Sequence, residues 1–382
     1  MSTEPPVSTE LPVGVNLLWM VHGEVGGSET YTMSHLRALA AYGNVDREVV
    51  LFALPGFTAR HPDLAQRFPI VEAPVSGTSR AVRVAVEATW LGQRLRERHV
   101  NVVHHPGGTL PLRSSLPTVL TVHDLQWVTF PRYFSRTKLS YLRARVGPSI
   151  RRAGVVLVNS RYVKETVVDY AGVSADVVRV VPPAVDAIPS EVNDPAEVRA
   201  RYGIPEPYFL YPAITYPHKN HLVLVWALSR LARTDIHLVF TGGVASMETT
   251  IETEAHRVGL QGRVHRLGRI PRPDLEALYL DAAGVLFPSA YEGFGMGVVE
   301  AMRRGCPVAA ADTTALPEVV GDAGLLIPPG DPEAWAGAIE RLTDDGGLRA
   351  ELAAAGRHRA AGFEPADVAR TLEEAYRDAA SG

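Results

Sequence analysis

The stretch of sequence that decides the fold spans residues 286–305 and reads LFPSAYEGFGMGVVEAMRRG. The apolar residues before Pro288 predict the end of a buried strand, and the glycines that follow predict a loop. A helix is expected from Met296 to Arg304, with Gly305 ending it. Because the first N–H groups of a helix have no partner within the helix, this N-terminus is a candidate site for an anion such as phosphate.

Two carboxylates lie on either side of this candidate anion site. Glu292 falls in the loop, and Glu300 falls eight residues later in the helix. Since a helix rises by about 1.5 Å per residue, the two could contact opposite ends of one elongated ligand, with its phosphates between them. A sugar nucleotide has this layout. The alternative is that Glu292 caps the helix and Glu300 faces solvent, and the residues alone leave both interpretations open.

The composition is that of an ordinary soluble protein with two domains. The chain has 382 residues, 46% of them hydrophobic, and a formal net charge of −4, which gives no global attraction for nucleic acid. The single cysteine, Cys306, excludes an intramolecular disulfide and is expected to be buried. We expect no membrane span and no signal peptide. Residues 1–12 are expected to form a disordered tail. The protein is expected to be cytoplasmic, and peripheral contact with the inner face of the membrane is left open.

Apolar runs alternate with helical stretches along the whole chain. This alternation predicts two doubly wound, Rossmann-like parallel sheets, one in residues 13–186 and one in residues 208–364. Prolines and charges predict a linker over 187–207, and residues 365–382 predict a final helix and tail. Strands are expected at residues 13–21, 48–53, 100–104, 118–122, 155–159, 177–188, 208–213, 236–241, 264–267, 284–287 and 308–311. A crevice between two such domains is a common ligand site.

A glycine-rich loop follows the first expected strand. Residues 22–28 read HGEVGGS, and an amphipathic helix is expected after them. Strand, glycine-rich loop and helix form the phosphate-binding arrangement of open α/β sheets, so Gly26 and Gly27 are candidate ligand contacts. The spacing is not GxGxxG, and a tight turn is the alternative.

Polar residues end two strands of the first half. His123 follows one of them and Asn159 ends the other, and both are expected at the carboxyl edge of the sheet. Between them, residues 126–149 are rich in aromatic and basic side chains. We interpret this stretch as an acceptor loop, a membrane-facing helix or a packed helix, and all three remain open.

Three strand ends of the second half also carry candidate site residues. Lys219 is expected in the first turn of a helix, where its charge opposes the helix dipole unless an anion binds there. Thr241 and Gly242 close one strand, and Arg269 and Ile270 follow another.

With these residues in place, the chain resembles the retaining glycosyltransferases of family four, which have the two-domain GT-B fold. The segment 288–302, PSAYEGFGMGVVEAM, resembles the family's signature of two glutamates separated by seven residues. The segments 316–324, LPEVVGDAG, and 329–332, PGDP, resemble its downstream segments. The similarity extends from about residue 13 to 375. It implies a final helix that crosses back to the first domain.

The resemblance also implies a role for each candidate. Glu300 would bind the ribose hydroxyls and Glu292 the transferred sugar. Lys219 would stabilise the leaving diphosphate without a metal ion or cofactor. The backbone amides of Phe294, Gly295 and Met296 would lie beside the phosphates. Arg269 and Ile270 would lie along the base. His123 would lie under the anomeric carbon, and Gly26 and Gly27 would lie near donor and acceptor.

One departure from the family concerns a phosphate-binding arginine. This sequence has Ala213, Ile214 and His218 where the family often has arginine, so phosphate binding would depend on Lys219, backbone amides or an arginine such as Arg161. The resemblance is strongest to bacterial mannosyltransferases acting on polysaccharide, glycolipid or small-molecule acceptors. It favours GDP-mannose as donor, with UDP- and dTDP-sugars open. A GT-B epimerase or phosphorylase, or a non-catalytic sugar-nucleotide-binding protein, are the alternatives.

Overall fold

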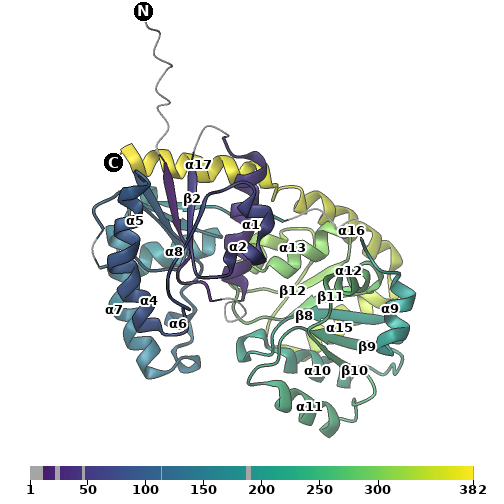
Figure 1. The fold of residues 1–382 in the computed structure, drawn as a ribbon. Coiled ribbons are helices and arrows are strands. Elements are labelled where there is room, and N and C mark those ends of the chain that lie inside the picture. Colours follow the sequence, from purple (N-terminus) through teal and green to yellow (C-terminus); the bar gives the residue numbers. More distant parts are fainter. Residues whose placement is uncertain (1–11, 22–25, 45–47, 113, 186–190, 382) are drawn as a thin grey trace, which may run out of the picture. The chain divides into compact units, whose positions relative to one another are not determined.

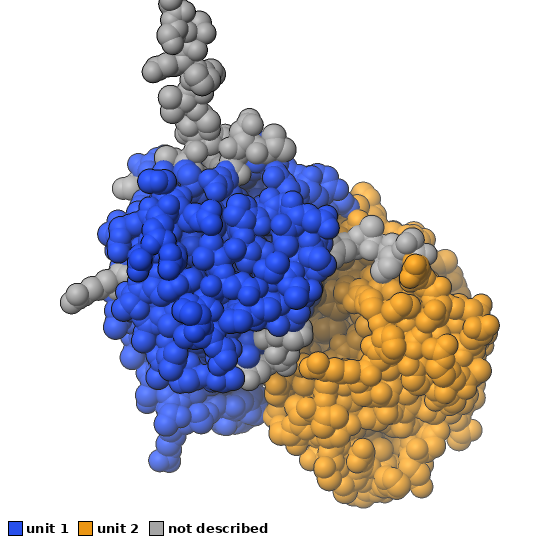
Figure 2. Space-filling model, in the orientation of Figure 1, with its two compact units in different colours: residues 1–184, 364–382 blue, residues 185–363 orange. Residues whose placement is uncertain are grey.

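The computed structural model describes residues 12–21, 26–44, 48–112, 114–185 and 191–381. The chain divides into two compact units (Figures 1 and 2). Unit 1 comprises residues 1–184 and 364–382, and unit 2 comprises residues 185–363. Each unit is built on one parallel sheet with helices packed against it, as the alternation of the sequence predicts.

Unit 1 has a seven-stranded sheet in the order β3-β2-β1-β4-β5-β6-β7. Its central strands are buried over their whole length, and this is why they read as continuous apolar runs instead of alternating ones. The strands are β1 (Val13–Asn16), β2 (Val49–Ala53), β3 (Ile70–Glu72), β4 (Val102–His105), β5 (Thr118–Val122), β6 (Val155–Val158) and β7 (Val178–Val180).

The helices of unit 1 connect these strands, except for the last helix of the chain. They are α1 (Gly27–Tyr42), α2 (Phe57–Arg60), α3 (Pro62–Ala65), α4 (Arg80–Val86), the π-helix η1 (Glu87–Leu91), α5 (Gly92–Glu97), α6 (Gln126–Thr129), the 3₁₀ turns η2 (Pro131–Tyr133) and η3 (Ala175–Val177), α7 (Arg136–Arg152), α8 (Arg161–Ala171) and α17 (Pro365–Ser381).

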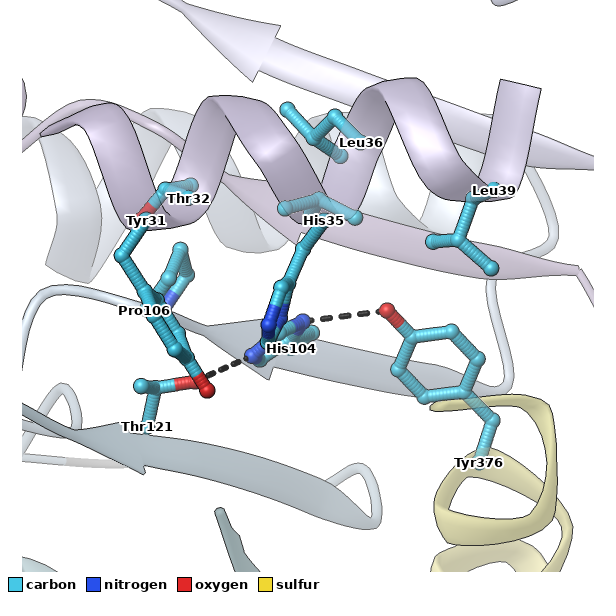
Figure 3. Close-up of a pocket in the computed structure, with 10 residues that line it drawn as sticks. Tyr31, Thr32, His35, Leu36, Leu39, His104, Pro106, Thr121 and Tyr376 are labelled. Carbon is cyan, nitrogen blue, oxygen red and sulfur yellow. Dashed lines mark hydrogen bonds between the residues drawn. The ribbon is translucent and has the colours of Figure 1, made fainter. Parts of the chain in front are cut away.

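Helix α17 returns to unit 1 and packs along α1, which confirms the crossover expected from the sequence. Its apolar face, which includes Val368 and Leu372, is buried in the core of unit 1. The hydroxyl of Tyr376 lies 3.0 Å from Nδ1 of His104 on β4, and Nε2 of His104 lies 2.7 Å from the Thr121 hydroxyl on β5 (Figure 3). These polar contacts line a cavity of about 10 Å³, which has room for roughly one water molecule.

Unit 2 has a six-stranded parallel sheet in the order β10-β9-β8-β11-β12-β13. Its strands are β8 (Tyr208–Pro212), β9 (His237–Thr241), β10 (Val264–Gly268), β11 (Gly284–Phe287), β12 (Val308–Ala311) and β13 (Leu325–Ile327). Its helices are α9 (Pro195–Tyr202), the 3₁₀ turn η4 (Pro217–Lys219), α10 (His221–Arg230), α11 (Glu248–Arg257), α12 (Arg272–Asp281), α13 (Met296–Arg303), α14 (Leu316–Val320), α15 (Pro332–Asp344) and α16 (Gly346–Ala360).

The structure differs from the sequence-based expectation in three places. The edge strands β3 and β13 were not predicted, and each has only three residues. Residues 195–202, inside the expected linker, form helix α9 of unit 2, where the Asp194 side chain accepts a hydrogen bond from the Glu197 amide. The expected tail falls almost entirely outside the described residues, as does most of the glycine-rich loop before Gly26.

The order of strands in unit 2 reverses between β8 and β11, which are neighbours in the sheet but not in the sequence. In open α/β sheets, ligands bind outside the carboxyl ends of the strands at such a switch point. The residues after β8 and after β11 are therefore those to examine for a ligand site.

Candidate active site

The loop between β11 and α13 is fixed to the turn that follows β8. The Ala290 amide donates a hydrogen bond of 2.8 Å to the carbonyl of His218 in η4. The buried Tyr211 hydroxyl lies 2.8 Å from both the Lys219 carbonyl and the Ser289 hydroxyl, so this one side chain joins β8, η4 and the loop. Two carboxyl-edge segments at the switch point thus form one rigid substructure.

Lys219 and Glu292 face each other within this substructure. Nζ of Lys219 lies 2.6 Å from Oε1 of Glu292, and the two side chains are 20% and 12% exposed. The Glu292 amide donates to the Thr314 hydroxyl at 3.1 Å, which holds the loop in place. A largely buried ion pair at the carboxyl end of two strands can stabilise an incoming anion and accept hydroxyl hydrogen bonds.

The position of Lys219 corrects one expectation from the sequence. Lys219 ends the 3₁₀ turn η4, and Asn220 in the left-handed conformation (φ 56°) separates it from α10. Lys219 does not lie in the first turn of α10, so its charge does not oppose the dipole of that helix and requires no bound anion there. The carboxylate of Glu292 balances this charge instead. The Asn220 side chain donates to the carbonyls of Pro288 and Pro329, at 3.1 and 2.7 Å.

The loop ends at Gly295, which is the N-cap of α13. Its φ is 99°, and an added Cβ would lie 2.7 Å from Cδ2 of Leu316, so the position requires glycine. No side chain among the described residues caps α13, and Met296 is its first residue. Phe294 packs edge-on against Phe363 in the core, which leaves its backbone as the part available to a ligand.

Glu300 lies on α13 and is 19% exposed. Its Oε1 accepts a hydrogen bond from Nη2 of Arg272 at 2.9 Å, and its Oε2 accepts one from the Tyr279 hydroxyl at 3.3 Å. Glu300 is thus a largely buried, hydrogen-bonded side chain, whereas the alternative interpretation of the sequence expected it to face solvent. Arg272 and Tyr279 were not identified from the sequence, because nothing in α12 indicates which face meets α13.

The carboxyl ends of β8, β9 and β10 come together beside this substructure. The Gly242 amide donates to the Gly268 carbonyl at 2.8 Å, and the Ala213 amide donates to the Thr241 carbonyl at 2.8 Å. Gly242 has a φ of 121°, and an added Cβ would lie 2.6 Å from the Ala213 carbonyl oxygen. The structure therefore brings Thr241 and Gly242 next to the segment that carries Arg269.

Arg269 and Ile270 follow β10 directly. Nε of Arg269 lies 3.4 Å from where a Cβ on Gly243 would be, so the guanidinium lies across the end of β9. Arg269 is exposed, and Ile270 is partly buried against the core of unit 2.

The candidates of unit 1 form a second group. Nε2 of His123 lies 2.7 Å from the Pro106 carbonyl, and the Asn159 side-chain amide donates to the His123 carbonyl at 2.8 Å. Nδ1 of His123, Oδ1 of Asn159 and Nε1 of the neighbouring Trp19 are buried and have no hydrogen-bond partner among the described residues. Burial lowers the pKa of His123 to about 4, so the ring is neutral near pH 7.

The remaining candidates of unit 1 are less informative. Gly26 is the N-cap of α1 and Gly27 is its first residue, and neither has a positive φ. An added Cβ on Gly27 would meet nothing within 4 Å, so the space beside it is open. Arg161 is the exposed first residue of α8, and it remains an unplaced candidate for phosphate binding.

Part of the segment 126–149 is a packed helix, which is one of the three interpretations offered by the sequence. The second half of α7 packs into the core through Val146 and Ile150, whereas η2 and the start of α7 are exposed. Within the described ranges, no helix is long and apolar enough to cross a membrane.

Two doubly wound parallel-sheet units in one chain have the architecture of the GT-B fold. The whole chain superimposes on sucrose-phosphate synthase from Thermosynechococcus elongatus with a TM-score of 0.78 and 22% identity, covering 96% of this chain and 98% of that one. It superimposes on Anabaena Alr3699/HepE, solved with UDP and glucose, with a TM-score of 0.74 and 22% identity, covering 96% and 99%.

Sequence comparison identifies the family. Residues 25–187 match the family described as Glycosyltransferase Family 4, and residues 196–359 match Glycosyl transferases group 1. The O-antigen chain mannosyltransferase B of Escherichia coli is 30% identical over 291 residues, covering 74% of this chain and 76% of that protein. A D-inositol 3-phosphate glycosyltransferase of Corynebacterium aurimucosum is 27% identical over 390 residues, covering 94% and 92%. The chain belongs to the family 4 glycosyltransferases.

Proposed function

We propose that this glycosyltransferase moves a hexose, with retention of anomeric configuration, from a nucleoside-diphosphate sugar to a hydroxyl of an acceptor. The observation that carries the proposal is the ion pair of Lys219 and Glu292, 2.6 Å apart at the β8–β11 switch point. Glu292 lies in the loop that leads into α13, whose N-terminal N–H groups lack a side-chain cap among the described residues. A diphosphate meets both a cation and a helix N-terminus there.

The ion pair has a role in the free enzyme and another in the complex. Without a donor, Lys219 and Glu292 balance each other's charge in a poorly hydrated site. A bound donor offers each of them a new partner: phosphate oxygens for Lys219 and sugar hydroxyls for Glu292. As the glycosidic bond breaks, negative charge grows on the diphosphate, and Lys219 then stabilises the transition state more than the ground state.

On one side of the diphosphate, Glu300 is assigned to the ribose. On the other side, Glu292 is assigned to the transferred sugar. The ends of β9 and β10, with Arg269 and Ile270, are assigned to the base. His123 is assigned to the transferred sugar. Because its Nε2 is held by the Pro106 carbonyl, the neutral ring offers Nδ1 as an acceptor for a sugar hydroxyl.

The donor is proposed to be GDP-mannose, since the similar Escherichia coli protein is named a mannosyltransferase. The Anabaena neighbour was solved with UDP-glucose, and for that reason UDP-sugars belong in every assay. A thermal-shift screen with UDP, GDP, dTDP and ADP identifies the nucleotide, because a ligand of the native state raises the unfolding midpoint. Proton NMR of the product then gives its anomeric configuration, and an inverted product would contradict the proposed retention.

Metal independence is part of the proposal. Lys219 and the α13 N-terminus supply positive charge to the leaving diphosphate, and no group of three potential metal ligands is present in the described part of the chain. We expect turnover in EDTA to stay within about twofold of that in Mg²⁺ or Mn²⁺, a small effect on the scale of metal-ion catalysis. Activity that disappears in EDTA and returns with Mn²⁺ would contradict this.

The acceptor is proposed to be lipid-linked and to be reached at an anionic membrane surface. Residues 126–152 carry seven Arg and Lys and no Asp or Glu, in a chain of net charge −4. In the exposed first part of this stretch, the rings of Phe130 and Tyr133 stack with centroids 5.5 Å apart, and Val128 is 45% exposed. Cations interleaved with exposed aromatic and apolar side chains fit an anionic lipid interface, where each cation contributes about 1 kcal/mol.

Sedimentation with vesicles tests this contact. The chain should bind vesicles containing phosphatidylglycerol and not pure phosphatidylcholine, and should dissociate as salt is raised. The double variant Arg136→Glu and Lys138→Glu should reduce binding at least tenfold. The control, Arg257→Glu with Arg341→Glu, makes the same charge change on unit 2 and should bind like wild type. Equal loss in both variants would show that net charge, and not this surface, governs binding.

A further inference from the structure

A series of four paired, charged side chains extends from the core of unit 2 to Glu300. Arg304 pairs with both carboxylate oxygens of Glu276, with its Nη2 at 2.6 Å from Oε1. Oε1 of Glu276 also lies 2.6 Å from Nε of Arg272, and Nη2 of Arg272 lies 2.9 Å from Oε1 of Glu300. The order is thus Arg304, Glu276, Arg272, Glu300, from α13 through α12 and back to α13.

In this series, the inner pair of Arg304 and Glu276 is more deeply buried than Arg272. Arg304 and Glu276 are 1% and 0% exposed, and their bidentate contact balances both charges within the core. Arg272 is 47% exposed, so the fold does not need it to neutralise Glu276. What Arg272 adds is the connection of this fixed pair to the Glu300 carboxylate.

Among the described residues, Glu300 has one donor on each oxygen, Arg272 on Oε1 and the Tyr279 hydroxyl on Oε2. A carboxylate oxygen has two lone pairs, so each oxygen keeps one for a further donor. Two adjacent hydroxyls, such as those of a ribose, match two acceptor positions held in one plane. Held at both oxygens, the carboxylate cannot rotate away from that plane.

We propose that Arg272 is a positioning residue for donor binding, which orients the Glu300 carboxylate towards the ribose hydroxyls by bridging it to Glu276. The proposal rests on the assignment of Glu300 to the ribose. Arginine suits the task because its planar fork can contact two carboxylates at once through different nitrogens, whereas lysine offers a single point charge.

Calorimetry with hydroxyl-deleted nucleotides tests the proposal. The probes are UDP and GDP, each compared with its 2′,3′-dideoxy counterpart. For wild type we expect the dideoxy nucleotide to bind at least tenfold more weakly. Arg272→Gln should weaken the ribonucleotide roughly tenfold, about 1.4 kcal/mol, and leave the dideoxy nucleotide within twofold. In Arg272→Gln, the ratio of ribonucleotide affinity to dideoxynucleotide affinity should therefore fall towards one. Arg272→Lys should recover only part of the wild-type ratio.

The controls separate positioning from folding. Arg257 pairs with Glu254 on α11 in a similar half-exposed setting (66% and 17%), and Arg257→Gln should leave the affinity ratio at the wild-type value. Arg272→Gln should keep a cooperative unfolding transition, because the Arg304–Glu276 pair stays intact. If Arg272→Gln does not fold, Tyr279→Phe removes the donor on Oε2 alone and should also lower the ratio.

The outcomes identify which assignment fails. A wild-type enzyme that binds ribo- and dideoxynucleotides equally would show that Glu300 does not contact the ribose, and the proposed donor site would be wrong in that respect. If wild type discriminates and Arg272→Gln discriminates equally well, then the ribose assignment stands and the positioning role of Arg272 is overturned. Binding of neither nucleotide would contradict the donor site itself.

Discussion

At the scale of single residues, Glu292 and Glu300 differ in their partners, although both are glutamates of the same sequence signature. Glu292 pairs with Lys219, and Glu300 pairs with Arg272, which also contacts the buried Glu276. In the proposed donor complex, Lys219 exchanges Glu292 for a phosphate, whereas Arg272 keeps its contact with Glu300. This difference predicts different consequences for the two substitutions.

Glu300→Ala should weaken the free nucleoside diphosphate and the sugar nucleotide alike, by about 1.5–3 kcal/mol for each hydrogen bond lost to a charged group. Glu292→Ala should leave free-nucleotide affinity nearly unchanged and reduce turnover, because the contact proposed for Glu292 is to the sugar. Lys219→Ala should reduce both. Calorimetry and steady-state kinetics on the three variants measure this, with exposed Glu333→Ala as the control. A reversed pattern for the two glutamates would mean that the donor lies in the opposite direction along α13.

The placement of Glu292 in the loop and of Glu300 in the helix that follows could be predicted from the sequence, because loop and helix are neighbours in the chain. The pairing of Lys219 with Glu292 across 73 residues could not. Arg272 and Tyr211 could not. Arg272 meets Glu300 across 28 residues, and Tyr211 meets Ser289 across 78, and only the packing of α12 and β8 decides those contacts. Tyr211 lies in a run of four buried strand residues, where nothing in the pattern separates a hydrogen-bonding tyrosine from a packing one.

At the scale of elements, the strands that position the site were predicted, whereas two of the edge strands, β3 and β13, were not. Central strands are buried on both faces and therefore form long apolar runs, whereas β3 and β13 are three-residue edge strands with exposed positions. The proline and the charged residues of segment 195–202 predict a linker, but the segment forms helix α9, because proline is well tolerated at the first position of a helix.

The end of β9 is an element boundary whose geometry permits a direct test. Gly242→Ala should lower the free energy of unfolding by about 2 kcal/mol or more, because the new Cβ would lie 2.6 Å from the Ala213 carbonyl oxygen at a positive φ. It should also weaken nucleotide binding if this edge holds the base. Gly262→Ala is the control, since its Cβ would meet nothing within 4 Å. Urea denaturation of both variants measures the effect, and equal stabilities would show that β9 relaxes without cost.

At the scale of the whole molecule, the chain buries several neutral histidines in unit 1. Burial lowers the pKa of His35 and His105 to about 3 and that of His123 to about 4. The unfolded chain has ordinary histidines that bind protons below about pH 6.5. Between that pH and the folded-state pKa values the unfolded state therefore binds more protons, and stability is present above pH 6.5 and lost as the pH falls.

We predict that the free energy of unfolding decreases from pH 7 to pH 5 by about 1.4 kcal/mol per pH unit for each such histidine, once the pH is below 6.5. Urea unfolding at several pH values gives this slope. His105→Gln should be less stable at pH 7 but have a shallower slope, because one of the buried bases is gone. His358→Gln, on an exposed part of α16, should leave the slope unchanged. A slope unaffected by His105→Gln would assign the acid sensitivity to other groups.

Helix α17 also determines when unit 1 can fold during synthesis. Its Tyr376 meets His104 across 272 residues, and all of unit 2 is translated between them. Chains grow at roughly 5–20 residues per second, so unit 1 waits many seconds, while unit 2 is translated, with the surface that α17 covers still bare. The half of the protein that leaves the ribosome first is thus the half that completes its core last. Chaperones have the longest time to act on the face of α1 that α17 will cover.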